Sequence, residues 1–171
     1  IHSLGFSPSG ELLAYGTTEG AVAIVNPETG AEVRSLLHGG PSVQCVGFDG
    51  SGKLVAAAGF GGLKLWTTDD GQEVGSESGI MQFAFGPGPA LAAADGKSIL
   101  LCDPPTGKSA RALARPGPAH ALAFAPDGKT LAAAIEDGTV KLLGLTGSER
   151  ILSGHAQAVR SVAWSPDGRL L

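Results

Sequence analysis

The sequence is poor in the residues that carry charge, stack on bases or hold metals. Charged residues make up 16% and aromatic residues 5% of its 171 residues, and it contains 2 cysteines and 1 methionine. Twelve lysines and arginines stand against 16 aspartates and glutamates, so the formal net charge is −4, and the basic residues form no cluster. Because nucleic-acid binding relies on basic patches that neutralise phosphates, we expect no DNA or RNA partner.

Signals for membranes and for export are also missing. No apolar run approaches the ~20 residues that a membrane-spanning helix needs, and the first residues do not follow the pattern of a secretory signal. We expect no membrane insertion; the compartment stays open, with the cytoplasm favoured. Cys45 and Cys102 stand in no CxxC pair and are predicted to be small core residues.

Sequence patterns of catalytic, metal or cofactor sites are absent as well. The GKS segments at 96–98 and 107–109 lack the earlier glycine of a phosphate-binding loop, and no G-x-S-x-G elbow occurs. The four histidines, at positions 2, 38, 120 and 155, have no zinc-ligand spacing. We therefore predict no catalytic residue, no metal and no cofactor.

What the sequence does contain is a repeat in which an aromatic residue is followed by a glycine- and proline-rich turn. The five copies are FSPSG at 6–10, FDGSG at 48–52, FGPGP at 85–89, FAPDG at 124–128 and WSPDG at 164–168. Their aromatic anchors, Phe6, Phe48, Phe85, Phe124 and Trp164, are separated by 42, 37, 39 and 40 residues. Repeats of about 40–45 residues are typical of the four-stranded blades of a β-propeller.

The strand that leads into each anchor alternates large and small residues, not apolar and polar ones. Two positions before the anchors stand Leu4, Val46, Phe83, Leu122 and Val162, and one position before them stand Gly5, Gly47, Ala84, Ala123 and Ala163. A sheet with one wet face alternates apolar with polar residues. The large/small pattern instead indicates sheets covered on both faces, as in stacked blades.

These observations predict an all-β fold, namely a β-propeller fragment that forms a single partial domain over 1–171. We expect four four-stranded antiparallel blades at about 1–40, 41–78, 79–117 and 118–156, the first strand of a fifth blade in 157–171, and almost no helix. Four blades and a fraction of a fifth cannot close with standard wedge geometry, so the fragment should form an open arc. Its terminal blades should each expose an apolar sheet face.

The last stretch, SGHAQAVRSVAWSPDGRLL at 153–171, resembles the WD-repeat family. Gly154 and His155 match the family's Gly-His pair, and Trp66 stands at its third-strand tryptophan position, although Val25, Cys102 and Leu143 stand there in the other blades. The resemblance implies that the five anchors, Trp66 and His155 are structural residues of the repeat. The Ala/Gly-rich composition gives the chain a bacterial appearance.

The family's buried network of a histidine, a hydroxyl residue, an aspartate and a tryptophan is incomplete in every blade. Glu19, Phe60 and Asp137 stand at the aspartate's turn position, and Ala56 and Ala133 replace hydroxyl residues. Blade stability is therefore expected to rest on packing and on the hydrogen bonds between strands.

The only organised information is the repeat, so we predict a non-enzymatic protein-interaction scaffold that belongs to a larger propeller in a longer protein. Its expected partners are other proteins, still unknown, and the remaining blades of the parent chain. The alternative is a propeller enzyme of the lactonase-like or quinoprotein-like type, with a metal or cofactor in the central channel.

A candidate protein-binding surface comes from the column four residues before each anchor, which is chemically mixed. It holds His2, Gln44, Met81, His120 and Arg160, and the neighbouring turn holds Glu19, Phe60, Asp95 and Glu136. Arginine and aromatic residues are common at interface hot spots, so we predict that these residues contact a partner. The simpler alternative is that they are solvated residues at the start of a strand.

Overall fold

The computed structural model describes residues 1–88 and 90–171; Pro89, the last residue of the FGPGP motif, lies outside the described residues. All regular elements in these ranges are β-strands, sixteen in number, and none is a helix. The prediction of an all-β fold is therefore confirmed. No described segment forms a helix long and apolar enough to cross a membrane.

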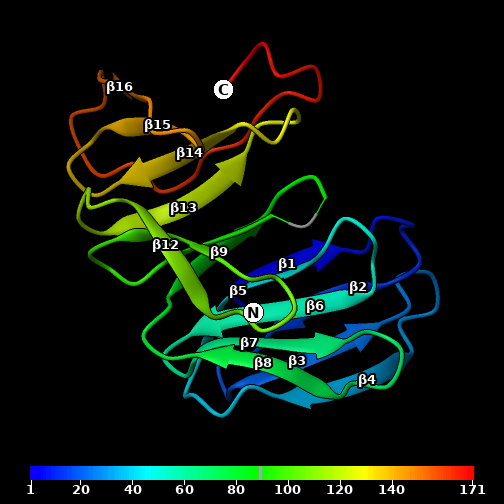
Figure 1. Cartoon of the computed structure of the whole chain (residues 1–171). Coiled ribbons are helices and arrows are strands. Elements are labelled where there is room, and N and C mark those ends of the chain that lie inside the picture. Colours follow the sequence, from blue (N-terminus) through cyan, green and yellow to red (C-terminus); the bar gives the residue numbers. More distant parts are fainter. Residues whose placement is uncertain (89) are drawn as a thin grey trace. The chain divides into compact units, whose positions relative to one another are not determined.

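The strands form four antiparallel sheets of four strands each, and in every sheet the strands are neighbours in sequence order (Figure 1). The first sheet contains β1 (Ser3–Phe6), β2 (Leu13–Gly16), β3 (Ala21–Val25) and β4 (Glu32–Leu37). The second contains β5 (Val43–Phe48), β6 (Leu54–Gly59), β7 (Gly62–Thr67) and β8 (Glu73–Glu77). The third contains β9 (Gln82–Phe85), β10 (Leu91–Ala94), β11 (Ile99–Cys102) and β12 (Ser109–Ala114). The fourth contains β13 (Ala119–Phe124), β14 (Thr130–Ile135), β15 (Val140–Gly144) and β16 (Glu149–Leu152). These four sheets are the blades of a partial β-propeller, numbered below in chain order.

The second strands show why small residues dominate the composition. Four consecutive residues of β10, Leu91–Ala94, are buried, as are five of the six residues in β6 and in β14. In a strand, successive side chains point to opposite faces of the sheet. Burial of every residue therefore means that both faces are covered, and alanine allows the neighbouring sheets to pack closely.

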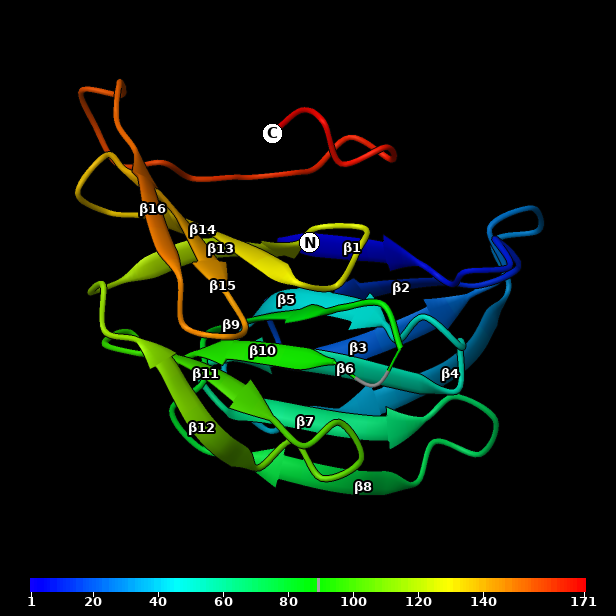
Figure 2. The same ribbon diagram turned by 45° about the horizontal axis from the view of Figure 1, so that its top comes forward.

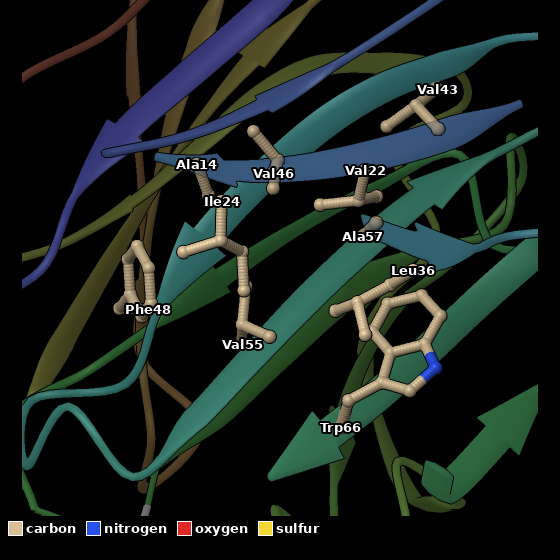
Figure 3. Packing of buried hydrophobic residues seen from close by; sticks show 10 residues of the cluster. All are labelled: Ala14, Val22, Ile24, Leu36, Val43, Val46, Phe48, Val55, Ala57 and Trp66. Carbon is tan, nitrogen blue, oxygen red and sulfur yellow. The ribbon is translucent and has the colours of Figure 1, made fainter. Parts of the chain in front are cut away.

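The chain divides into two compact units, which are described separately. Unit 1 comprises Ile1–Met81 with Pro104–Lys108 and holds blades 1 and 2; unit 2 comprises Gln82–Asp103 with Ser109–Leu171 and holds most of blades 3 and 4. The core of unit 1 lies between its two blades, where Val43, Val46 and Phe48 of β5 pack against side chains of β2 and β3 (Figure 3). Trp66 of β7 belongs to this cluster and is 3% exposed.

Unit 2 repeats this arrangement with smaller side chains. Leu122 of β13 packs with Ala92 and Ala94 of β10 in one cluster, which Leu131 and Leu143 of blade 4 complete. The contact between the blades is again made by the first strand of the later blade, because β13 packs against β9 and β10. The large/small pattern of the first strands thus serves blade stacking in both units.

Residues 157–171, expected to open a fifth blade, pack onto blade 4 without forming a strand (Figure 2). Val159 is buried, and its backbone N–H donates to the Ile135 carbonyl at 3.1 Å. Val159 forms a cluster with Ala132, Ala134 and Val140, against which Val162 and Trp164 pack. The Trp164 indole N–H donates to the Ala123 carbonyl at 3.1 Å. A strand is defined by its hydrogen-bonded ladder with a partner strand, and residues 157–171 form no such ladder.

The first blade shows the uncovered apolar side chains expected of a terminal blade. Leu4 and Phe6 of β1 are 60% and 57% exposed, whereas the equivalent Val46 and Phe48 of β5 are buried against blade 1. The positions whose side chains are buried in β5 therefore carry solvent-exposed side chains in β1.

Candidate interaction surface

The turn between β6 and β7 presents a large apolar side chain to solvent. Gly59 pairs with Gly62 across this hairpin, so Phe60 and Gly61 form its tip. Phe60 is 66% exposed although its neighbours on both strands are buried. An exposed aromatic ring contributes little buried area to the stability of the fold.

A buried histidine side chain forms a hydrogen bond with the β6–β7 turn. His38 follows β4, is 1% exposed, and its Nε2 lies 2.8 Å from the carbonyl oxygen of Gly62. A carbonyl can only accept a hydrogen bond, so Nε2 carries the hydrogen and donates. His38 Nδ1 is buried and has no hydrogen-bond partner among the described residues.

The β6–β7 turn also packs closely against the glycine backbone of the segment that follows β4. A Cβ at Gly40 would come within 2.8 Å of the Gly61 Cα, and one at Gly61 would come within 2.9 Å of the Gly40 nitrogen. Gly20, which has φ +76°, lies against the Gly40 carbonyl in the same way and accepts a hydrogen bond from the His38 N–H at 3.0 Å. The turns of blades 1 and 2 and the segment between the blades therefore form one continuous surface, and we call it the Phe60 face.

The other predicted binding residues of unit 1 lie at the same ends of their strands. His2 directly precedes β1, and Glu19 occupies the β2–β3 turn; both are exposed. Gln44 is half-buried and donates from its side-chain amide to the Ser42 hydroxyl at 3.0 Å. Met81, half-buried, directly precedes β9.

In unit 2 the structure brings together two predicted residues that are forty positions apart in the sequence. Arg160 is exposed, and its Nη1 lies 3.3 Å from His120 Nε2 and 3.4 Å from His120 Nδ1. Glu136 is exposed in the β14–β15 turn and donates its backbone N–H to the Pro118 carbonyl at 3.0 Å. Asp95 in the β10–β11 turn accepts from the N–H groups of Lys97 and Ser98 at 2.8 and 2.6 Å.

The β14–β15 turn of unit 2 also has hydrogen bonds between its own residues. Asp137 Oδ1 accepts from the Thr139 hydroxyl at 2.6 Å and from the Thr139 backbone N–H at 2.9 Å. These hydrogen bonds favour the charged carboxylate, so they lower the pKa of Asp137 below its ordinary value. The pKa values of Asp70 and Asp167 are lowered for the same reason, chiefly by the hydroxyls of Thr67 and Ser165.

Two residues that hold neighbouring blades together were not identified from the sequence. Arg34 of β4 donates to the carbonyls of Asp69 and Asp70 in the β7–β8 turn at 2.6 and 2.9 Å. Arg111 of β12 donates to the carbonyl of Leu145 in the β15–β16 turn at 2.7 Å. Both arginines stand at equivalent strand positions, but this equivalence becomes visible only when the register of each sheet is known.

Repeat anchors occupy several environments. Phe48 and Trp66 are buried, Phe6 is exposed, and Phe85 makes an edge-to-face contact with Phe83 at 5.5 Å between ring centroids. Phe124 packs in the core of unit 2. His155 is exposed, so the buried histidine of the described blades is His38. Within the described ranges no group of three metal-binding side chains occurs.

Comparison with known proteins finds similarity to WD repeats. The family model described as "WD domain, G-beta repeat" matches residues 112–142 and 147–171. The WD repeat-containing protein SL1-17 of Schistosoma mansoni is 53% identical over 53 residues, which cover 30% of this chain and 18% of that protein. Residues 112–142 and 147–171 of this chain are therefore similar to WD repeats.

A second relative matches almost the whole chain at lower identity. Telomerase protein component 1 of Rattus norvegicus is 25% identical over 177 residues, which cover 99% of this chain and 7% of that protein. The chain therefore spans less than a fifth of the length of either of these relatives. WD repeats in general serve as scaffolds for protein interactions, and the resemblance of this chain to the family is confirmed.

Proposed function

We propose that this chain is a non-enzymatic interaction scaffold that binds a protein partner through the loops at the strand starts. The residues proposed to contact a partner are His2, Gln44, Met81, Glu19 and Phe60 in unit 1, and His120, Arg160 and Glu136 in unit 2. The family is typically made of interaction modules without catalytic chemistry, which supports this assignment.

The observation that carries the proposal is the exposure of Phe60 on a turn fixed by its surroundings. Burying an aromatic ring at an interface is among the largest single contributions to binding, and such residues dominate hot spots. The glycine contacts and the His38 bond hold the turn, so little conformational entropy is lost when a partner covers the ring.

A capture experiment tests the proposal. The chain, immobilised, is compared with the triple variant Phe60→Ala, His120→Ala, Arg160→Ala for the proteins it retains, measured by quantitative mass spectrometry. We expect partners of the wild-type chain to be lost from the triple variant while the Tm of the two proteins agrees within about 2 °C.

The matched control is Val33→Ala, which removes another exposed apolar side chain, 52% exposed on β4, from outside the loops. It should retain the same proteins as wild type. Undiminished capture by the triple variant would overturn the assignment, and loss of capture by Val33→Ala would show that any apolar surface suffices.

We further propose that residues 1–171 form part of one propeller domain whose other blades belong to the parent protein. The uncovered side chains of β1 and the unpaired segment 157–171 support this view, because both lack the neighbour that their equivalents have elsewhere in the chain.

A further inference from the structure

The fourth strands of the four blades share one position that faces the following blade. The position lies in the same row of each sheet as the small residue before the anchor. Strand pairing matches Ile24 with Arg34, Leu65 with Gly75, Leu101 with Arg111 and Leu142 with Arg150. The equivalent residues are therefore Arg34, Gly75, Arg111 and Arg150.

In blades 1 and 3 this position holds an arginine that binds backbone carbonyls of the next blade. Arg34 donates to two carbonyls of the β7–β8 turn, and Arg111 donates to one carbonyl of the β15–β16 turn. In each case the acceptor lies in the turn between the third and fourth strands. Arginine suits this task because its guanidinium presents several donors in a fixed fork.

In blade 2 the same position faces the same kind of turn, but without a side chain. A Cβ at Gly75 would clash with the backbone of Thr106, which lies between β11 and β12. The turn itself therefore takes the space of the arginine. At all three described steps from one blade to the next, the position contacts the turn between the third and fourth strands of the following blade.

Arg150 of blade 4 is the fourth member of this column and lacks such a turn. It is exposed, and its guanidinium has no hydrogen-bond acceptor among the described residues. Two residues further along β16, Leu152 lines a pocket of about 300 Å³ that opens between blade 4 and the final segment, and Val140, Val159, Val162 and Leu171 also stand in its walls.

The walls of this pocket have counterparts in the core of unit 1. By strand register and by distance from the anchor, the wall residues correspond to Val22, Leu36, Val43, Val46 and Val55. These five residues pack with Ala57 and Trp66 in one cluster (Figure 3). The pocket on blade 4 therefore lies where a second and a third strand of a following blade would place their apolar side chains.

We propose that the exposed face of blade 4 binds a further four-stranded blade, that a bulky third-strand side chain fills the pocket, and that Arg150 clamps carbonyls of its last turn. This inference rests on the proposal that the chain is part of a larger propeller. It names Arg150 as the residue that fixes the next blade.

The chain itself supplies a probe for this face. Residues 159–171 correspond to 43–55, so appending a copy of residues 56–78 after Leu171 completes a fifth blade from the chain's own sequence. We expect the extended chain to have a higher Tm than the original, and the appended tryptophan, copied from Trp66, to show the blue-shifted fluorescence of a buried indole.

Arg150→Ala then separates the clamp from general packing. In the extended chain it should lower the Tm by about 3 °C, and in the original chain by less than about 1 °C. Arg111→Ala is the matched control, since its acceptor is present in both chains and its effect should be equal in both. Replacing the appended tryptophan by serine should abolish most of the gain in Tm.

The proposal would be overturned by an unchanged Tm on appending the residues, by an appended tryptophan that stays exposed, or by an Arg150→Ala effect that is equal in both chains. A loss of Tm on Arg150→Ala in the original chain that grows with protein concentration would assign the face to a second copy instead. None of these results bears on capture through Phe60, so the two proposals fail separately.

Discussion

Two turns at equivalent positions, β6–β7 in unit 1 and β14–β15 in unit 2, differ in what holds them. The first is held by its surroundings, with His38 bonded to the Gly62 carbonyl and Gly40 packed beside Gly61. The second also contacts neighbouring segments, because the Glu136 N–H donates to the Pro118 carbonyl and Gly138 lies close to the His155 carbonyl. It adds a bond of its own between Asp137 and Thr139. The difference teaches that contacts with neighbouring segments can hold such a turn without a polar side chain inside it, which leaves its tip free to carry Phe60.

The largest expected effect comes from adding one methyl group at Gly20, which lies against Gly40, the residue packed beside the β6–β7 turn. Gly20→Ala places a Cβ against the Gly40 carbonyl at a positive φ, so we expect a loss of about 3 kcal/mol or more in the free energy of unfolding. Gly30→Ala is the matched control, since Gly30 has φ +70° and open space around it. It should cost about 1 kcal/mol. Denaturant unfolding of both variants measures the difference; equal losses would contradict the packing described for Gly20.

Next in size is the loss of the buried histidine. His38→Ala leaves the Gly62 carbonyl without its donor, and we expect a loss of about 2 kcal/mol in the free energy of unfolding. As a comparison in unit 2, His155→Ala removes an exposed histidine and should cost less than about 0.5 kcal/mol. Urea unfolding monitored by circular dichroism compares the two variants. A larger effect at His155 would reverse the contrast between the turns.

A smaller effect should appear in acid, and of the two turns only β14–β15, which carries Asp137, should show it. The pKa of Asp137 is lower in the folded chain than its ordinary value, so its contribution to stability is complete above about pH 4 and is lost as the pH falls through the folded pKa. Asp137→Asn keeps an acceptor for Thr139 and does not titrate, so its stability should fall less steeply below pH 4 than that of wild type. Thermal unfolding from pH 5 to pH 2 tests this, and parallel curves would count against it.

The smallest expected effect on stability is that of Phe60→Ala. Because the ring is 66% exposed, its removal should change the free energy of unfolding by less than about 0.5 kcal/mol. A loss above about 2 kcal/mol, measured by urea unfolding, would mean that Phe60 supports the fold and is not free for a partner.

The sequence was sufficient to predict the blades, because the anchors and the large/small alternation before them follow directly from packing sheets on both faces. It also placed Phe60 in a turn between two strands, as the structure has it, whereas its contact with a partner stays a prediction. The roles of His38, Arg34 and Arg111 could not be predicted in this way. Their partners are backbone carbonyls of residues 24 to 36 positions away, and carbonyls carry no sequence signal.

The Gly-His motif also shows that a sequence match does not predict which histidine is buried. The match to the family's Gly-His pair is at Gly154 and His155, yet the buried histidine is His38, which is followed by two glycines. His155 lies in the segment that leads to the unpaired residues 157–171. A motif identifies the residue type at a position in a repeat, but burial depends on whether the next blade is there to cover it.

Calorimetric titration of one captured partner against wild type, Phe60→Ala and Val33→Ala tests the role of the Phe60 face most directly. Phe60→Ala should bind at least tenfold more weakly, which corresponds to about 1.4 kcal/mol, while Val33→Ala binds as wild type does and all three proteins share one Tm. Equal affinity of the three proteins for a partner that binds unit 1 would contradict the assignment of this face.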